Sequence, residues 1–220
     1  MLIGINGEIG CGKSTATKYL EAKYGMTEYM FAGPLKAIAI AMGFEHHQIY
    51  GTQEQKLEIN KFWGISGRRF LQVFGSEVCR DFLPTVLPQM ASDRGVWIKL
   101  FQKFYSENSE KHIVVSDVRF GDESAALREL SGYVVRIVRP MATSAVTSAA
   151  SSVSSTAVHK SETQADNIHP YAVIINDGTL EDLYVKLDQV VENIFSQNVW
   201  NILQDSFIFY LKFETKYTNI

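Results

Sequence analysis

The chain has 220 residues, of which 46% are hydrophobic and 20% charged, enough for one α/β domain with a large core. A net charge of −3 gives no broad basic field, which disfavours a nucleic-acid polymer as partner and would suit a small nucleotide better. The two cysteines, Cys11 and Cys79, are too few for a disulfide framework and favour a reducing compartment. No apolar stretch predicts a signal peptide or a membrane span, so we expect a cytoplasmic protein.

Residues 1–24 contain the motif around which the chain is organised. Leu2–Asn6 predicts a buried strand, and a helical pattern begins at Lys13, so the order is strand, loop and helix. The sequence between them has the spacing G-x-x-x-x-G-K-[ST] of a phosphate-binding loop. In such a loop, glycines let backbone N–H groups surround a polyphosphate, the lysine adds charge and the serine binds Mg²⁺. The predicted ATP site comprises Gly7, Gly10, Cys11, Gly12, Lys13, Ser14 and Thr15.

A strand, a helix and a polar stretch are expected after this motif. Residues 27–31 predict a short strand and residues 35–42 a helix. The inward face of that helix would carry Leu35, Ile38, Ala39 and Met42. In the polar stretch 43–63, His46 and His47 have no further ligand at metal-binding spacing, so we expect both in a solvated loop rather than at a metal site.

Residues 67–82 predict one amphipathic helix. At about 100° per residue, one side is apolar, with Phe70, Phe74, Val78 and Phe82. The opposite side is polar, with Arg69, Gln72, Ser76 and Arg80. Because that stripe has two arginines and no acidic residue, it favours an anion site over a solvated face.

The second half of the chain begins with a break at Pro84 and Pro88, after which helical spacing resumes over residues 97–104. A strand at residues 113–116 then ends at Asp117. The end of such a strand is where a phosphate-loop protein places a second Mg²⁺-holding carboxylate, so we assign Ser14 and Asp117 to the metal.

The remaining segments complete an alternating pattern. A helix at residues 123–130 precedes a strand at 133–138, and a fifth strand at 171–176 precedes a long helix with a reciprocal cap at Thr179 and Asp182. Five strands alternating with helices predict an α/β fold whose mostly parallel sheet is covered by helices on both faces. The phosphate loop should lie at the carboxyl end of the first strand, where the strand order reverses.

We expect one domain over residues 1–220. Within it, residues of about 35–90 would bind a nucleoside monophosphate, about 140–168 would form a lid, and about 198–220 a C-terminal extension. The lid expectation rests on residues 141–157, which carry no charge and consist mainly of Ser, Ala and Thr. The aromatic run at 207–213 is too short to cross a bilayer and favours a packed strand or helix over a membrane or partner contact.

Taken together, these stretches resemble the deoxynucleoside monophosphate kinases of bacteriophages and large DNA viruses. The matching sequences are the phosphate loop, FAGPLK at 31–36, GRRFLQVFGSEVCRDF at 67–82, VVSDVRFGDE at 114–123, YVVRIVRP at 133–140 and HKSE at 159–162. The helix GRRFLQ-x-FG-x-E followed by SDVRF is the most specific of them. The resemblance implies a P-loop kinase fold with monophosphate-binding helices and a lid. It also implies phosphoryl transfer from ATP·Mg²⁺ to a deoxynucleoside monophosphate, in the host cytoplasm if the protein is viral.

The resemblance implies roles for particular residues. Lys13, Asp117 and Arg119 would be catalytic, and the acceptor would be held by Lys36, Arg69, Gln72, Arg80 and Arg119. No general base is needed, because the acceptor phosphate oxygen is ionised at neutral pH. Lids of this kinase group generally bring in arginines, whereas residues 141–157 have none, so closure would depend on bordering residues such as Arg139 and Lys160.

Two other functions stay open. One is another small-molecule kinase of the same fold, such as a dephospho-coenzyme A or phosphomevalonate kinase. The other is a non-catalytic protein that binds ATP and has no saturable monophosphate site. The residues do not decide which bases are accepted, and they leave open whether the protein forms a homodimer.

Overall fold

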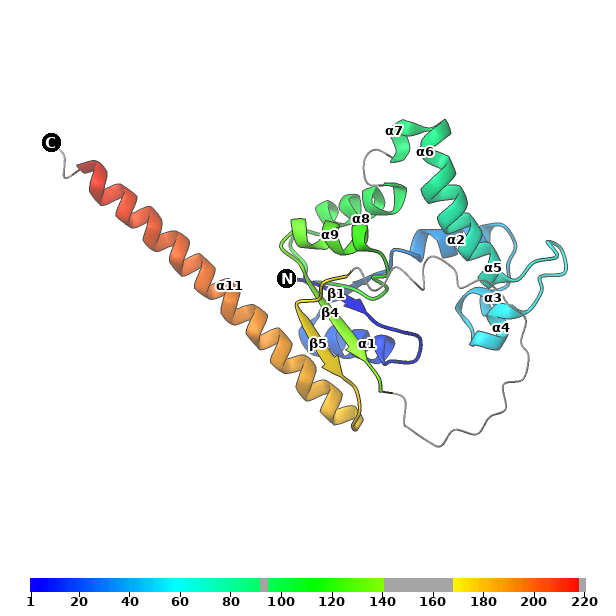
Figure 1. Cartoon of the computed structure of the whole chain (residues 1–220), viewed down its shortest axis with the longest axis horizontal. Coiled ribbons are helices and arrows are strands. Elements are labelled where there is room, and N and C mark those ends of the chain that lie inside the picture. Colours follow the sequence, from blue (N-terminus) through cyan, green and yellow to red (C-terminus); the bar gives the residue numbers. More distant parts are fainter. Residues whose placement is uncertain (92–94, 141–167, 218–220) are drawn as a thin grey trace. The chain divides into compact units, whose positions relative to one another are not determined.

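The structure is a computed structural model that describes residues 1–91, 95–140 and 168–217. The chain divides into two compact units, Met1–Ile175 and Asn176–Ile220. The first unit contains the sheet and the phosphate loop, and it is the unit that concerns function (Figure 1).

The described part of the first unit is built on a five-stranded sheet in the order β2-β3-β1-β4-β5, and each neighbouring pair is parallel. The strands are β1 (Leu2–Asn6), β2 (Thr27–Tyr29), β3 (Ile113–Val115), β4 (Tyr133–Val138) and β5 (Ala172–Ile175). The predicted parallel sheet is therefore confirmed. Because β1 lies between β3 and β4, the strand order reverses at β1, and the phosphate loop begins where this strand ends.

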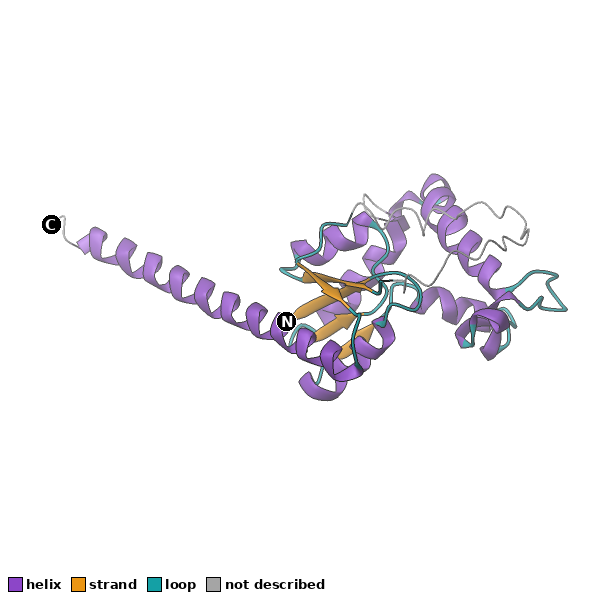
Figure 2. Cartoon of the chain, turned by 60° about the horizontal axis from the view of Figure 1, so that its bottom comes forward, coloured by secondary structure: helices purple, strands orange, loops and turns teal. Residues whose placement is uncertain are grey.

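Helices cover both faces of the sheet, as predicted. Helix α1 (Lys13–Tyr24) lies on one face, and α8 (Gly95–Glu107) and α9 (Gly121–Glu129) lie on the other (Figures 1 and 2). The main core fills the second face, where Trp97 and Phe101 of α8 pack with strand residues such as Val115. This core fixes the position of the loop between β3 and α9.

Several short helices lie between β2 and α8. They are α2 (Gly33–Ala41), α3 (His46–Tyr50), α4 (Gln53–Leu57), α5 (Gly67–Gln72), η1 (Val73–Phe82), α6 (Leu83–Val86) and α7 (Pro88–Ala91). The expectation of a loop over residues 43–63 was wrong, because both α3 and α4 carry N-terminal capping boxes. His46 and His47 are exposed as expected. The predicted break occurs at Pro88, because α6 ends at Val86 and α7 begins at Pro88. Pro84 causes no break, since it lies in the first turn of α6, which follows η1 directly.

The prediction of one α-helix over residues 67–82 was wrong. An α-helix ends at Gln72 and a π-helix, η1, continues to Phe82. The wider π turn changes which side chains share a face. Ser76, predicted on the polar side, is 9% exposed, whereas Phe82, predicted on the apolar side, is 58% exposed. In the neighbouring helix α2, Leu35 and Ala39 are buried as predicted. The inward placement predicted for Ile38 and Met42 was wrong, because Ile38 and Met42, which is the C-cap of α2, are both exposed.

The second unit contains helix α11 (Leu180–Tyr217), which runs through residue 198 without interruption. The predicted cap is present, because the Asp182 N–H donates to Thr179 Oγ1 and the Thr179 N–H donates to Asp182 Oδ2. The run at 207–213 is helical, and its packing stays a prediction. Within the described ranges, no helix combines the length and the apolar character needed to span a bilayer.

The indole of Trp97 provides a first test of the core. Its Nε1–H donates to the carbonyl oxygen of Gly75 in η1 at 3.0 Å, and Trp97 is 6% exposed. Trp97→Phe should therefore lower the free energy of unfolding by about 1–3 kcal/mol, since it removes a buried hydrogen bond and leaves a gap. Trp63→Phe is the matched control, because the Trp63 Nε1–H also donates to a carbonyl, that of Met42, but Trp63 is 42% exposed. Chemical denaturation should show a clearly smaller loss for Trp63→Phe, and equal losses would contradict the assignment.

Candidate active site

The phosphate loop joins β1 to α1 and contains three glycines with positive φ: Gly7 at +148°, Gly10 at +80° and Gly12 at +108°. A Cβ atom on Gly7 would lie 2.3 Å from the carbonyl oxygen of Ile137 in β4, so no side chain fits there. Gly12 is the N-cap of α1 and offers no side-chain acceptor to the helix start. The first N–H groups of α1 can therefore bind an anion.

Lys13 lies over this loop. Its Nζ donates to the carbonyl oxygens of Gly7 at 2.7 Å and Glu8 at 2.6 Å. Burial lowers the pKa of Lys13. A polyphosphate would offer this ammonium a stronger, charged acceptor than the two neutral carbonyls. Ser14 is exposed in the first turn of α1, as a metal-binding hydroxyl must be.

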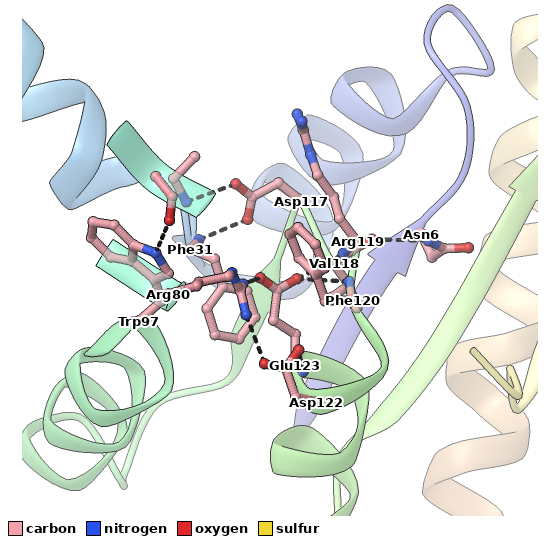
Figure 3. Close-up of polar contacts among 12 residues, drawn as sticks. Asn6, Phe31, Arg80, Trp97, Asp117, Val118, Arg119, Phe120, Asp122 and Glu123 are labelled. Atoms are coloured by element: carbon pink, nitrogen blue, oxygen red, sulfur yellow. Dashed lines mark hydrogen bonds and ion pairs between the residues drawn. The ribbon is translucent and has the colours of Figure 1, made fainter. Parts of the chain in front are cut away.

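A buried polar contact lies at the end of β1, where the phosphate loop begins. Asn6, the last residue of β1, donates from Nδ2 to the carbonyl oxygen of Val118 at 2.9 Å. Arg136 of β4 donates from Nε to Asn6 Oδ1, also at 2.9 Å. Asn6 therefore ties the end of β1 to β4. It also ties it to Val118 in the segment that follows β3 (Figure 3).

Asp117 follows β3, at the strand end where the sequence predicted it. Its two carboxylate oxygens accept the backbone N–H groups of Phe31, at 2.7 Å, and Ala32, at 2.9 Å (Figure 3). Asp117 thus anchors the start of α2, the helix that carries Lys36. Each oxygen can accept a further hydrogen bond, so these contacts are compatible with a water-mediated role at Mg²⁺.

Each of four cationic side chains lies within electrostatic range of at least one of the others; we call Lys36, Lys56, Arg68 and Arg119 the cation cluster. Burial lowers the pKa of Lys36, and the charges of Lys56 and Arg119 lower it further while Asp117 opposes them. Burial likewise lowers the pKa of Lys56, together with the charges of Arg119 and Arg68. The charges of Arg119 and Asp117 also affect the pKa of Lys13, so Arg119 lies within electrostatic range of the phosphate loop.

Sequence reasoning found Lys36 and Arg119 but missed Lys56 and Arg68. Lys56 lies in α4, within the stretch that was assigned to a loop. Arg68 precedes Arg69 in the same motif, but the helical-face analysis selected Arg69. The density of basic residues at 68–69 was the available signal for Arg68, whereas nothing in the local sequence marks Lys56.

Arg80 is paired with two acidic side chains of α9. Its guanidinium pairs with Asp122, with Nη1 to Oδ2 at 2.6 Å, and with Glu123, and it stacks 3.9 Å from the centre of the Phe120 ring. The sequence stripe lacked an acidic partner, but α9 supplies two. A guanidinium so paired is poorly placed to hold an acceptor phosphate, and we do not retain Arg80 in that role.

Three other predicted residues, Arg69, Gln72 and Arg139, lie in the described part of the chain. Arg69 is exposed, and its guanidinium makes no hydrogen bond or ion pair among the described residues. Gln72 is half-buried at the end of α5, and Arg139 is exposed after β4. Lys160 and residues 141–157 of the expected lid lie outside the described residues.

The predicted Mg²⁺ site can be compared with the metal-ligating side chains that the described residues offer. Among the described residues, no cluster of three or more His, Cys, Asp or Glu side chains could hold a metal ion alone. Mg²⁺ at nucleotide sites is commonly bound by one or two protein oxygens together with phosphates and water. Ser14 and Asp117 fit that pattern.

Comparisons with known proteins agree with this geometry. A family model described as deoxynucleotide monophosphate kinase matches residues 42–187. A protein of Acanthamoeba polyphaga mimivirus, provisionally named as such a kinase, is 34% identical over 90% of this chain and 100% of its own length. The chain belongs to the deoxynucleotide monophosphate kinase family. The resemblance found in the sequence is thereby confirmed.

One further relative and one solved structure are also similar to this chain. The deoxynucleotide monophosphate kinase of Escherichia phage RB69 is 29% identical over 136 residues. These residues are 60% of this chain and 47% of that protein. Dephospho-CoA kinase from Campylobacter jejuni is 15% identical, with a TM-score of 0.46 over 90% of this chain and 98% of the other. This last similarity carries no functional assignment.

Proposed function

We propose that this protein transfers a phosphoryl group from ATP to a deoxynucleoside monophosphate in the presence of Mg²⁺, giving the deoxynucleoside diphosphate and ADP. The supporting observation is that Asp117, whose carboxylate anchors the start of α2, lies within electrostatic range of both Lys13 in the phosphate loop and Lys36 in α2, and that Arg119 does so as well. Family membership supplies the substrate class. A cytoplasmic location belongs to the same proposal.

In the proposed reaction, the chain aligns and neutralises two anionic substrates. Lys13 and the N–H groups of the loop hold the donor phosphates. Lys36, Arg69 and Arg119 hold the acceptor phosphate, and Lys56 and Arg68 add positive charge nearby. The acceptor oxygen is already ionised, so alignment and charge neutralisation account for catalysis without a general base. Mg²⁺, held through Ser14 and Asp117, would supply further charge neutralisation at the donor phosphates.

A coupled ADP-release assay tests the proposal directly. The purified protein is given ATP and Mg²⁺ with each common deoxynucleoside or ribonucleoside monophosphate, and separately with dephospho-coenzyme A and phosphomevalonate. We expect ADP release that saturates with at least one deoxynucleoside monophosphate. Saturation only with dephospho-coenzyme A or phosphomevalonate would favour another small-molecule kinase. ATP binding with no saturable acceptor would favour a non-catalytic role.

Arg69 gives a test of the acceptor side. Its exposed guanidinium is not engaged within the described residues, so Arg69→Ala should remove an acceptor contact without disturbing packing. The KM for the monophosphate should rise by about tenfold or more, with little change in the KM for ATP. Lys18→Ala, which removes an exposed charge from α1, is the control and should change neither constant. Equal effects of Arg69→Ala on both substrates would contradict the acceptor assignment.

A further inference from the structure

Glu123 is an acidic side chain that the proposed reaction does not use, although it is only 2% exposed. It lies in the first turn of α9, and its two carboxylate oxygens face different donors (Figure 3). Oε2 accepts the backbone N–H of Arg119 at 2.8 Å and that of Phe120 at 3.1 Å. Oε1 accepts from Arg80 Nη2.

The Arg80 side chain links this carboxylate to η1. Besides Glu123, the guanidinium contacts Asp122 Oδ2 and lies over the Phe120 ring. Burial raises the pKa of Glu123, and the positive charge of Arg80 is the largest influence that opposes this rise. Every partner of the two carboxylate oxygens is an N–H donor, so the contacts are those of an ionised carboxylate that accepts on both oxygens.

The orientation of Arg119 depends on this arrangement. Its side chain is exposed and points away from Glu123 (Figure 3), and its guanidinium makes no hydrogen bond or ion pair among the described residues. The point from which this side chain starts is therefore set by its backbone. That backbone is held by the N–H bond to Glu123 and, two residues earlier, by the anchoring of Asp117.

We propose that Glu123 is a positioning residue, which orients Arg119 for the phosphoryl acceptor and is itself held by Arg80 from η1. The link to the reaction rests on the proposed function, in which Arg119 touches the acceptor phosphate. The contact also connects the short helices between β2 and α8 with the segment that follows β3. A displacement of η1 would therefore act through Arg80 and Glu123 on the backbone of Arg119.

The chemistry requires a carboxylate at this position. Glutamine has nearly the same shape, but it offers one oxygen and one NH₂ group. In Glu123→Gln, the NH₂ must face either the Arg80 guanidinium or the two backbone N–H groups, so a donor opposes a donor in both orientations. Asp122→Asn is the matched control, because Asp122 also pairs with Arg80 but contacts neither the Arg119 nor the Phe120 N–H.

The test combines kinetics with amide hydrogen exchange on the full chain. Glu123→Gln should lower kcat by about 10- to 100-fold, as expected for a displaced catalytic group, with little change in the KM for ATP. The double variant Glu123→Gln with Arg119→Ala should be about as active as Arg119→Ala alone, because both changes remove the same function. The Arg119 and Phe120 amides should exchange faster in Glu123→Gln, and Asp122→Asn should keep both wild-type rates and activity within about twofold.

Several outcomes would overturn the proposal. Losses of activity that multiply in the double variant would show that Glu123 acts independently of Arg119. Unchanged exchange at both amides would show that Glu123 does not hold this backbone. If Glu123→Gln does not fold, the variant Arg80→Lys is used instead, because lysine keeps one positive charge at this position. It should show faster exchange at the Arg119 and Phe120 amides and a partial loss of kcat. Wild-type values for both would refute the role of Arg80 in holding Glu123. A wild-type protein without transfer activity refutes the proposed function, and the exchange rates then still decide whether Glu123 holds Arg119.

Discussion

Lys13→Ala should lower turnover by at least about 10²-fold, which corresponds to roughly 3 kcal/mol of lost transition-state stabilisation. The ammonium already lies over the loop, where it donates to the carbonyl oxygens of Gly7 and Glu8. It is partly desolvated, so its charge acts on bound phosphates through a less polar medium than water. Steady-state kinetics with saturating ATP and monophosphate measure the loss.

The control for this variant is Lys18→Ala on the exposed side of α1. It removes the same charge from the same helix without touching the loop, so turnover should stay within about twofold of the wild type. Thermal unfolding of both variants should be close to that of the wild type, which separates chemistry from folding. Near-normal turnover in Lys13→Ala would remove the phosphate loop from the mechanism.

Gly7→Ala should be the most damaging change to the architecture of the site. The residue has φ of +148°, and an added Cβ would lie 2.3 Å from the Ile137 carbonyl oxygen and 2.7 Å from Cys11 Sγ. Backbone strain and the steric clash should together lower the free energy of unfolding by about 2–5 kcal/mol. Denaturant unfolding without nucleotide measures this effect.

Gly10→Ala provides the comparison within the same loop. Gly10 also has a positive φ, +80°, but no atom lies within 4 Å of a Cβ built on it. Gly10→Ala should therefore lower the free energy of unfolding only through backbone strain, by about 1–2 kcal/mol. If the two variants are equally stable, then the contact with Ile137 does not determine the path of the loop.

Much of the first unit could be predicted because its signals are local. The glycine spacing after Leu2–Asn6 marks both the loop and the start of α1. Apolar runs such as Ile113–Val115 mark buried parallel strands, since both faces of such strands are covered. Asp117 was predicted at the end of that strand by the same reasoning, and the structure places it there.

The errors arose where packing between distant segments decides local structure. Residues 73–82 have the apolar spacing of an α-helix, but η1 adopts the π form, in which Gly75 lies against Leu35 of α2 and accepts the Trp97 N–H. Likewise, the polar side of the predicted helix offers Arg80 no acidic partner. Its partners, Asp122 and Glu123, are some forty residues away in sequence and reach it only in the folded chain.

By itself, the sequence determined the phosphate loop, the alternation of strands and helices and the resemblance to a kinase family, because each depends on residues that are neighbours along the chain. Only the tertiary structure decided which charges lie near one another. It brings Lys56 within electrostatic range of Lys36, Arg68 and Arg119, and it pairs Arg80 with α9. The physical reason is that the availability of a charge depends on the groups that surround it in space.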